Sequence, residues 1–210
     1  MDVGRYTGMP EAAARHKAFV LICLAALMVC LLGCNNDKQP PLPSWAPVPG
    51  FALTNQSNAS FGTEQLRGKV WVANFIFTRC PTVCPGISRM MSYLQENLEK
   101  EGLNVMLVSF SVDPDFDTPE VLDAYARRYS ADPARWHFLT GPSDAVHEAV
   151  RGGFKMAMEK VETVGEPPDI LHGTQFVLVD KELQIRAYHD SNDPEFLGNV
   201  LRDAKRLTTH

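Results

Sequence analysis

Apolar residues along this chain follow two alternating spacings, one typical of buried strands and one typical of helices. Residues 69–77 and 104–112 are nearly continuous apolar runs, as expected of strands that are buried on both faces of a sheet. Between these runs, apolar residues recur every three or four positions, which predicts a helix over residues 86–101 with one face in the core. Met90 and Met91 fall on that face, and we therefore assign them to the core. The pattern predicts a strand–helix–strand unit.

The alternation of strands and helices continues to the C-terminus. It predicts, in order, a helix over 117–130 capped by Asp117 or Thr118, a strand over 136–139, a helix over 143–151 capped by Ser143, a hairpin of strands 174–180 and 184–189, and a helix that opens at Pro194. Residues 154–171 interrupt this order and are predicted to form an inserted hairpin or loop. Such an alternation is typical of a three-layer α/β domain.

The N-terminal segment has the pattern of a secretory signal. A basic flank precedes an apolar run over residues 18–33, which is short for a membrane-spanning helix of roughly 20 residues. The run ends in LLGC, which resembles a bacterial lipoprotein processing site, so Cys34 is expected to carry the lipid as the first mature residue. The alternative is an uncleaved single-span anchor. Both interpretations place residues 35–210 on the far side of the membrane.

A proline-rich segment follows the signal. Residues 35–50 contain five prolines, and proline favours the extended polyproline II conformation. We expect this segment to be a semi-rigid tether between the membrane and the rest of the chain. Residues 51–210 are then predicted to form a single domain with a sizeable core.

The net charge and the cysteine content limit the classes of function that are expected for this chain. The 210 residues carry a formal net charge of −5, whereas nucleic-acid-binding proteins usually present a basic face, so no nucleic-acid partner is expected. Of the five cysteines, only Cys80 and Cys84 lie in the predicted domain. Two cysteines so close together cannot form a disulfide framework for a whole fold. The two cysteines indicate a local site with a chemical role.

Both cysteines belong to the motif TRCPTVCPG, where the first predicted strand leads into a helix. Pro85 has no N–H and fits only in the first helical turn, so the helix is expected to begin one or two residues before Cys84. Cys84 then lies in the first turn and Cys80 in the loop before it. Both sulfurs would lie near the positive end of the helix dipole, which favours the thiolate over the thiol.

The spacing of the two cysteines suits a metal ion. Residues four apart on a helical turn have Cβ atoms roughly 5–6 Å apart, which can seat one metal or, with modest movement, a disulfide. Thiolates select Cu(I) or Zn. A structural zinc site needs four protein ligands, and the domain has no further cysteine, so a histidine is expected to complete a three-ligand site. His172 is best placed, because it precedes a predicted central strand. The other candidates are His137, His147, His189 and His210.

Four segments, in order, are similar to the sequence blocks of the Sco/SenC family. They are FIFTRCPTVCPGI (75–87), SVDPDFDTPEVLDAYARRY (111–129), WHFLTG (136–141) and DILHGTQFVLVD (169–180). The resemblance covers about residues 50–207. There are two departures near the expected ligands: Thr82 stands where many members have Asp, and Gly173 stands where a polar residue is frequent.

The resemblance implies a thioredoxin-like three-layer sandwich with an insertion before the histidine. It also implies that Cys80, Cys84 and His172 bind copper, as Cu(I) and Cu(II). The chain would then be a membrane-anchored periplasmic lipoprotein and metallochaperone, which delivers copper to, or matures, the binuclear copper site of cytochrome c oxidase. Its expected partners are the copper-bearing subunit of that oxidase and another periplasmic copper donor.

The same cysteines support an alternative activity. A thiol–disulfide oxidoreductase would use Cys80 and Cys84 as attacking and resolving thiols, and would reduce the cysteines of the oxidase copper site without an obligatory metal. A requirement for His172 separates the two functions, because disulfide exchange needs no third ligand. A peroxiredoxin-type peroxidase is less favoured, since that family has Thr or Ser three residues before its reactive cysteine, where this chain has Phe77.

Overall fold

The structure is a computed structural model that describes residues 40–156, 158–161 and 169–209, with the backbone alone for 158–161 and 169–172. The predicted signal, Cys34 and His210 lie outside the described residues. Leu42–His210 forms one compact unit. Within the described part of the chain, no helix is both long enough and apolar enough to cross a bilayer.

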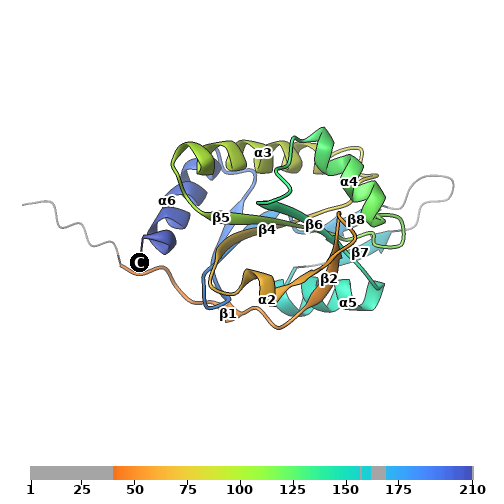
Figure 1. Ribbon diagram of the computed structural model, residues 1–210, viewed down its shortest axis with the longest axis horizontal. Coiled ribbons are helices and arrows are strands. Elements are labelled where there is room, and N and C mark those ends of the chain that lie inside the picture. Colours follow the sequence, from red (N-terminus) through yellow and green to blue (C-terminus); the bar gives the residue numbers. More distant parts are fainter. Residues whose placement is uncertain (1–39, 157, 162–168, 210) are drawn as a thin grey trace, which may run out of the picture. The chain divides into compact units, whose positions relative to one another are not determined.

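Three parallel strands form the centre of an eight-stranded sheet (Figure 1). They are β4 (Val70–Ile76), β5 (Val105–Ser111) and β6 (Trp136–Thr140). Every residue of β4 and β5 is buried, which explains why their sequences are continuous apolar runs rather than alternating ones. The predicted strands thus exist, and both of their faces are covered.

Antiparallel strands extend the sheet on both sides of this centre. On one side lie β9 (Gln175–Val179), β10 (Gln184–Asp190) and β1 (Ala46–Pro47), and on the other lie β2 (Ala52–Asn55) and β3 (Ser60–Gly62). β9 pairs with β4, with Ala73 opposite Val177. β1 pairs with β10, so part of the proline-rich segment belongs to the folded unit.

Helices cover both faces of the sheet and make it the middle of three layers (Figure 1). One face carries α3 (Cys84–Lys100), α4 (Pro119–Arg128) and α6 (Phe196–Thr208), and the other carries α2 (Thr63–Leu66), α5 (Ser143–His147) and the π-helix η1 (Glu148–Gly153). The predicted thioredoxin-like α/β sandwich is therefore confirmed.

Aromatic side chains fill the core between the sheet and η1. Phe110 contacts Phe51, Phe75 and Phe154, with ring centroids 5.3, 5.9 and 5.1 Å away. Trp71 packs edge-on against Phe154 at 5.8 Å. Because burial of one such ring stabilises the fold by about 1.5–3 kcal/mol, this cluster fixes the strands that lead to the cysteines.

The insertion predicted over residues 154–171 contains a hairpin. Its strands are β7 (Met158–Val161) and β8 (Asp169–His172), and Met158 lies opposite His172. This pair forms a separate two-stranded sheet. Figure 1 places the hairpin at the end of the molecule where α3 begins.

The structure also differs from the sequence prediction in local details. The β2–β3 pair was not predicted, because its strands are only four and three residues long and mix polar with apolar residues. Ser143 is the first helical residue rather than the cap, a position taken by Pro142. Asp117 does not cap α4: Thr118 does, and its hydroxyl accepts a hydrogen bond from the Val121 amide at 3.4 Å.

Candidate metal centre

The cysteine motif lies where β4 leads into α3. The helix begins at Cys84, with Val83 as its N-cap and Pro85 in the first turn. Proline is accepted there because the first amides of a helix lack partners within the helix. Cys80 lies in the preceding loop, as predicted, and its amide donates to the Phe77 carbonyl at 3.2 Å.

The two cysteines face one another across this turn. Neither sulfur is in a disulfide, and the exposed fractions are 7% for Cys80 and 0% for Cys84. The Cys84 amide donates a hydrogen bond to the Cys80 sulfur at 3.4 Å, and the Thr82 hydroxyl lies 3.7 Å from the same atom. The helix N-terminus thus points a donor at Cys80, which stabilises negative charge on that sulfur.

The environment separates the acidities of the two thiols. Burial raises the pKa of Cys80, but hydrogen bonds from Cys84 and Thr82 outweigh it, and the net pKa is below the ordinary value. Burial also raises the pKa of Cys84, and there the hydrogen bond to Phe77 is too weak to compensate. Burial thus favours the thiol at Cys84, whereas the helix N-terminus was predicted to favour the thiolate at both positions.

A turn after β5 supports the loop that carries Cys80. Asp117 is fully buried and accepts the Thr78 amide at 3.1 Å and the Thr78 hydroxyl at 2.5 Å. Burial raises the pKa of Asp117 despite these hydrogen bonds. Asp113 accepts from the Arg79 guanidinium. This role of the two carboxylates was not predicted from the sequence. The sequence signal was the position of Asp113 and Asp117 after a second buried strand. If that strand is parallel to β4, the residues that follow the two strands lie at the same edge of the sheet.

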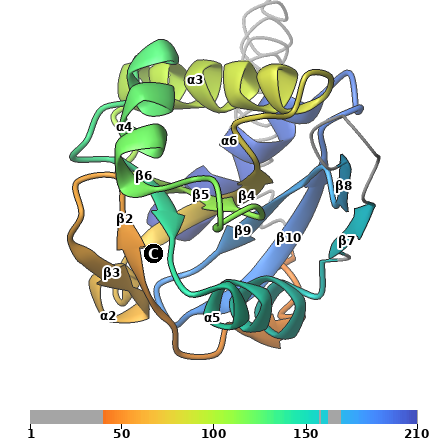
Figure 2. The ribbon, with the colours of Figure 1, turned by 90° about the vertical axis from the view of Figure 1, so that its right-hand side faces the viewer.

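The backbone brings His172 to the same end of the sheet. β9 runs antiparallel to β4 and starts at Gln175, so its first residues lie beside the end of β4 that continues to the cysteines. His172 ends β8 just before this start. Only its backbone is described, so the structure does not test His172 as a ligand. Figure 2 shows β8 at the side of the sheet that carries β9 and β10.

Met156 accounts for the glycine that follows His172. A Cβ atom at Gly173 would lie 2.5 Å from the sulfur of Met156, whose side chain is buried. Atoms do not approach so closely without one of them moving, so a side chain at Gly173 would displace the methionine.

The other candidate histidines have different surroundings. His137 stacks on Phe61 with centroids 4.0 Å apart, and burial lowers its pKa to about 4. His189 is buried 3.7 Å from Asp203. His147 is exposed. Among the residues whose side chains are described, no three of the His, Cys, Asp and Glu side chains form a metal-binding group, so none of these histidines completes a site with both cysteines.

Three solved structures are similar to this chain. A SCO1/SenC family lipoprotein from Bacillus anthracis is 37% identical, with a TM-score of 0.72, over 80% of this chain and 98% of that one. BsSco, a member of the Sco family of cytochrome c oxidase assembly proteins with an identified disulfide switch, is 31% identical, with a TM-score of 0.71, over 82% and 99%. Copper-bound ScoI from Bradyrhizobium japonicum is 25% identical, with a TM-score of 0.67, over 77% and 99%.

The similarity includes all of the elements that position the cysteines. The model of the SCO1/SenC family matches residues 45–206, from β1 to the last turns of α6. This range contains both cysteines, the turn after β5, the hairpin and β9. The chain therefore belongs to the SCO1/SenC family.

Proposed function

We propose that this chain binds copper and acts in the assembly of cytochrome c oxidase, with Cys80, Cys84 and His172 as the metal ligands. The observation that carries this proposal is the pair of cysteines at the start of α3, which are not joined by a disulfide, with a backbone amide directed at the Cys80 sulfur. Sulfur ligands suit Cu(I), and three ligands leave the ion transferable. The copper-bound relative from Bradyrhizobium japonicum supports the choice of metal.

The two sulfurs would bind the incoming ion in sequence. Cys80 has the lower pKa and the larger exposed fraction, so its thiolate makes the first bond. Cys84 then loses its proton to solvent, because a coordinating thiol is deprotonated by the charge of the metal. The amide at the helix N-terminus offsets part of the extra negative charge. His172, from the hairpin before β9, supplies the third ligand.

Copper titration of the full chain tests this proposal. We expect one ion per chain, with sulfur-to-copper charge-transfer absorption in the Cu(II) form. Cys80→Ser and Cys84→Ser should abolish that absorption. His172→Ala should weaken binding, whereas the control His147→Ala should bind normally, because His147 is an exposed side chain at the end of α5. Unchanged copper affinity in His172→Ala would remove the third ligand.

The unequal acidity of the two thiols favours a second candidate function, the reduction of a partner's disulfide. The Cys80 thiolate would attack the disulfide, form a mixed disulfide and release one partner thiolate. Cys84 would lose its proton and attack the Cys80 sulfur. The partner leaves with two thiols, and the chain keeps a Cys80–Cys84 disulfide. The disulfide switch identified in BsSco supports redox chemistry at this pair.

His172 separates the two functions. The substrate for the test is a peptide with the two cysteines of the oxidase copper-bearing subunit, supplied as a disulfide. If reduction is the main activity, His172→Ala should reduce this peptide at the wild-type rate while it binds copper poorly. Loss of both activities in His172→Ala would favour copper delivery, with a periplasmic donor and the copper-bearing subunit as partners.

The proposed location is the periplasmic face of a membrane, with a lipid on Cys34. The similarity to a SCO1/SenC family lipoprotein from Bacillus anthracis supports this anchor. Metabolic labelling with a radioactive fatty acid tests it: the wild-type chain should be labelled, and Cys34→Ala should not. Equal labelling of Cys30→Ala and wild type is the matched control, and label retained in Cys34→Ala would contradict the proposal.

A further inference from the structure

Two consecutive residues before Cys80 are held by a different part of the chain. Thr78 donates its amide to Asp117 Oδ2 at 3.1 Å and its hydroxyl to Asp117 Oδ1 at 2.5 Å. Ser111, the last residue of β5, donates its hydroxyl to Asp117 Oδ2 at 2.5 Å. Asp117 is fully buried, so its carboxylate joins the end of β5 to the start of the cysteine loop without competition from water.

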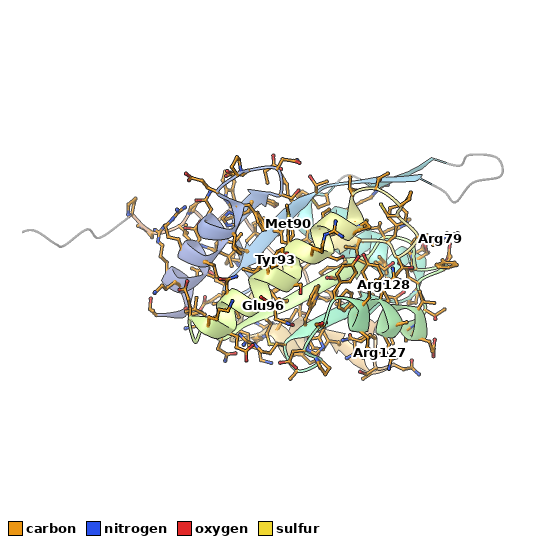
Figure 3. All side chains as sticks on the ribbon, turned by 90° about the horizontal axis from the view of Figure 1, so that it is seen from above. Arg79, Met90, Tyr93, Glu96, Arg127 and Arg128 are labelled. Atoms are coloured by element: carbon orange, nitrogen blue, oxygen red, sulfur yellow. The ribbon has the colours of Figure 1, made fainter. Side chains whose placement is uncertain are left out.

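The next residue, Arg79, is held by the same turn. Its guanidinium donates to Asp113 Oδ2 from Nε at 3.0 Å and from Nη2 at 2.5 Å. It also lies 4.1 Å from the ring centre of Phe116. Figure 3 shows Arg79 at the end of the molecule where α3 begins. The guanidinium of Arg79 thus makes an ion pair with Asp113 and a cation–π contact with Phe116, and both interactions fix the residue next to Cys80.

Hydrogen bonds within the turn hold it together. The Asp113 amide donates to the Ser111 hydroxyl at 3.1 Å, and the Asp117 amide donates to the Asp113 carbonyl at 2.9 Å. Cys84 is fixed on the other side by the first turn of α3. The position of the Cys80 sulfur relative to Cys84 thus depends on how the turn holds Thr78 and Arg79.

The geometry points to Asp117, and with a smaller effect Asp113, as positioning residues of the cysteine site: they hold Thr78 and Arg79 where the two sulfurs can share one copper ion. This inference rests on the proposed copper binding. Asp117 acts on the cysteine loop through its hydrogen bonds to the amide and hydroxyl of Thr78. It is a buried acceptor of three donors, which an amide cannot replace, because an amide has one oxygen and its NH2 group is a donor.

Asp180 offers a matched control at the other end of β4. It is also a buried carboxylate, and it accepts hydrogen bonds from the amides of Glu182 and Gln184 and from Arg186. Its turn is joined to the amino end of β4, where the Gly68 amide donates to the Lys181 carbonyl. Asp180→Asn therefore disturbs a comparable hydrogen-bonded carboxylate away from the cysteines.

The experiment compares the Cu(I) affinity of full-length variants, measured by competition with a chromophoric chelator. Replacement of residues that orient metal ligands typically lowers affinity about 10- to 100-fold, and we expect this for Asp117→Asn. Asp113→Asn should show a smaller loss, and Asp180→Asn should remain within about twofold of wild type. The charge-transfer band of the Cu(II) form should shift in Asp117→Asn and stay in place in Asp180→Asn.

Thr78 provides a milder pair of variants if Asp117→Asn does not fold. Thr78→Ser keeps both donors to Asp117 and should bind copper like wild type, whereas Thr78→Val lacks the hydroxyl and should bind more weakly. Wild-type affinity and an unshifted band in both Asp117→Asn and Thr78→Val would overturn the inference. If wild type itself binds no copper, the proposed function fails. A change in the Cys80–Cys84 reduction potential in Thr78→Val, absent in Thr78→Ser, would then still support positioning, because both variants keep the charge of Asp117.

Discussion

Buried carboxylates hold the chain at both ends of β4, but their partners differ in sequence distance. At the amino end, Asp180 accepts from residues two, four and six positions further along, all within one hairpin. At the carboxyl end, Asp117 accepts from Thr78, 39 positions earlier and in another loop. The first carboxylate closes a local turn. The second fixes two loops relative to each other, and one of those loops carries the thiols.

This difference shows how a buried, hydrogen-bonded carboxylate, which is a common stabilising feature, becomes part of the cysteine site. A buried carboxylate whose hydrogen bonds are satisfied stabilises the fold at either end of β4, and it does so by the same type of interaction at both ends. Only at the carboxyl end does it also determine where reactive side chains lie. The two ends should therefore respond differently to chemical modification, to pH and to changes in packing.

The largest expected effect is on thiol reactivity at the carboxyl end. In folded protein at pH 7, iodoacetamide should modify Cys80 in Cys84→Ser about 100-fold faster than Cys84 in Cys80→Ser, because thiolate is the nucleophile. Cys80 has the lowered pKa, whereas burial raises that of Cys84. Mass spectrometry of the modified peptides gives the rate at each cysteine.

Denatured protein is the control for this comparison. In denaturant both cysteines should react at similar rates, since neither the helix N-terminus nor burial remains. Similar rates in the folded variants as well would show that the hydrogen bonds to the Cys80 sulfur do not lower its pKa.

The sequence predicts local features of the two ends well. The prediction of the hairpin turn between residues 180 and 184 needed only two apolar runs and the polar residues between them. Pro85 placed Cys84 in the first helical turn, because a missing N–H limits where proline can lie in a helix. In both cases the residues that determine the structure are neighbours in sequence.

Long-range features could not be predicted in this way. The role of Asp117 depends on the parallel register of β4 and β5, in which Ile76 lies opposite Ser111, and nothing near Asp117 in the sequence identifies Thr78 as its partner. The raised pKa of Cys84 depends on the burial of its side chain in the folded chain. The sequence placed Asp117 at the start of a helix because aspartate is a frequent cap.

A smaller effect is expected on the free energy of unfolding when the pH is lowered, because of a histidine near the amino ends of the parallel strands. His137, the second residue of β6, has a pKa of about 4, chiefly because of burial, and its Nδ1 atom is buried with no hydrogen-bond partner found in the described structure. A lowered pKa means that the unfolded chain binds the proton first. The stabilisation is present above pH 6.5 and is lost as the pH falls towards 4.

After allowance for partial exposure, His137 should contribute about 1–2 kcal/mol to the loss of unfolding free energy between pH 7 and 4.5. Urea unfolding at both pH values measures this contribution as the difference between wild type and His137→Gln. His147→Gln, at an exposed position, should follow wild type. A pH dependence in His137→Gln that equals that of wild type would show that this ring is not held neutral.

The smallest effect is expected where the hairpin joins β9. Gly173→Ala would place a Cβ atom 2.5 Å from the Met156 sulfur, and the flexible methionine side chain must move, at a cost of about 1 kcal/mol in unfolding free energy. Gly198→Ala is the control: it lies in α6 with nothing within 4 Å of the added atom, and it should stabilise the chain by about 0.5–1 kcal/mol.

A double variant tests whether the methionine is the cause. With Met156→Ala, the space beside Gly173 is open, so adding Gly173→Ala should cost less than it does in wild type, as expected for residues in contact. Because Gly173 follows His172, the Cu(I) affinity of Gly173→Ala should fall by a few-fold, a smaller change than in Asp117→Asn. If the two substitutions were additive in unfolding free energy, Met156 would not be the group that requires glycine at this position.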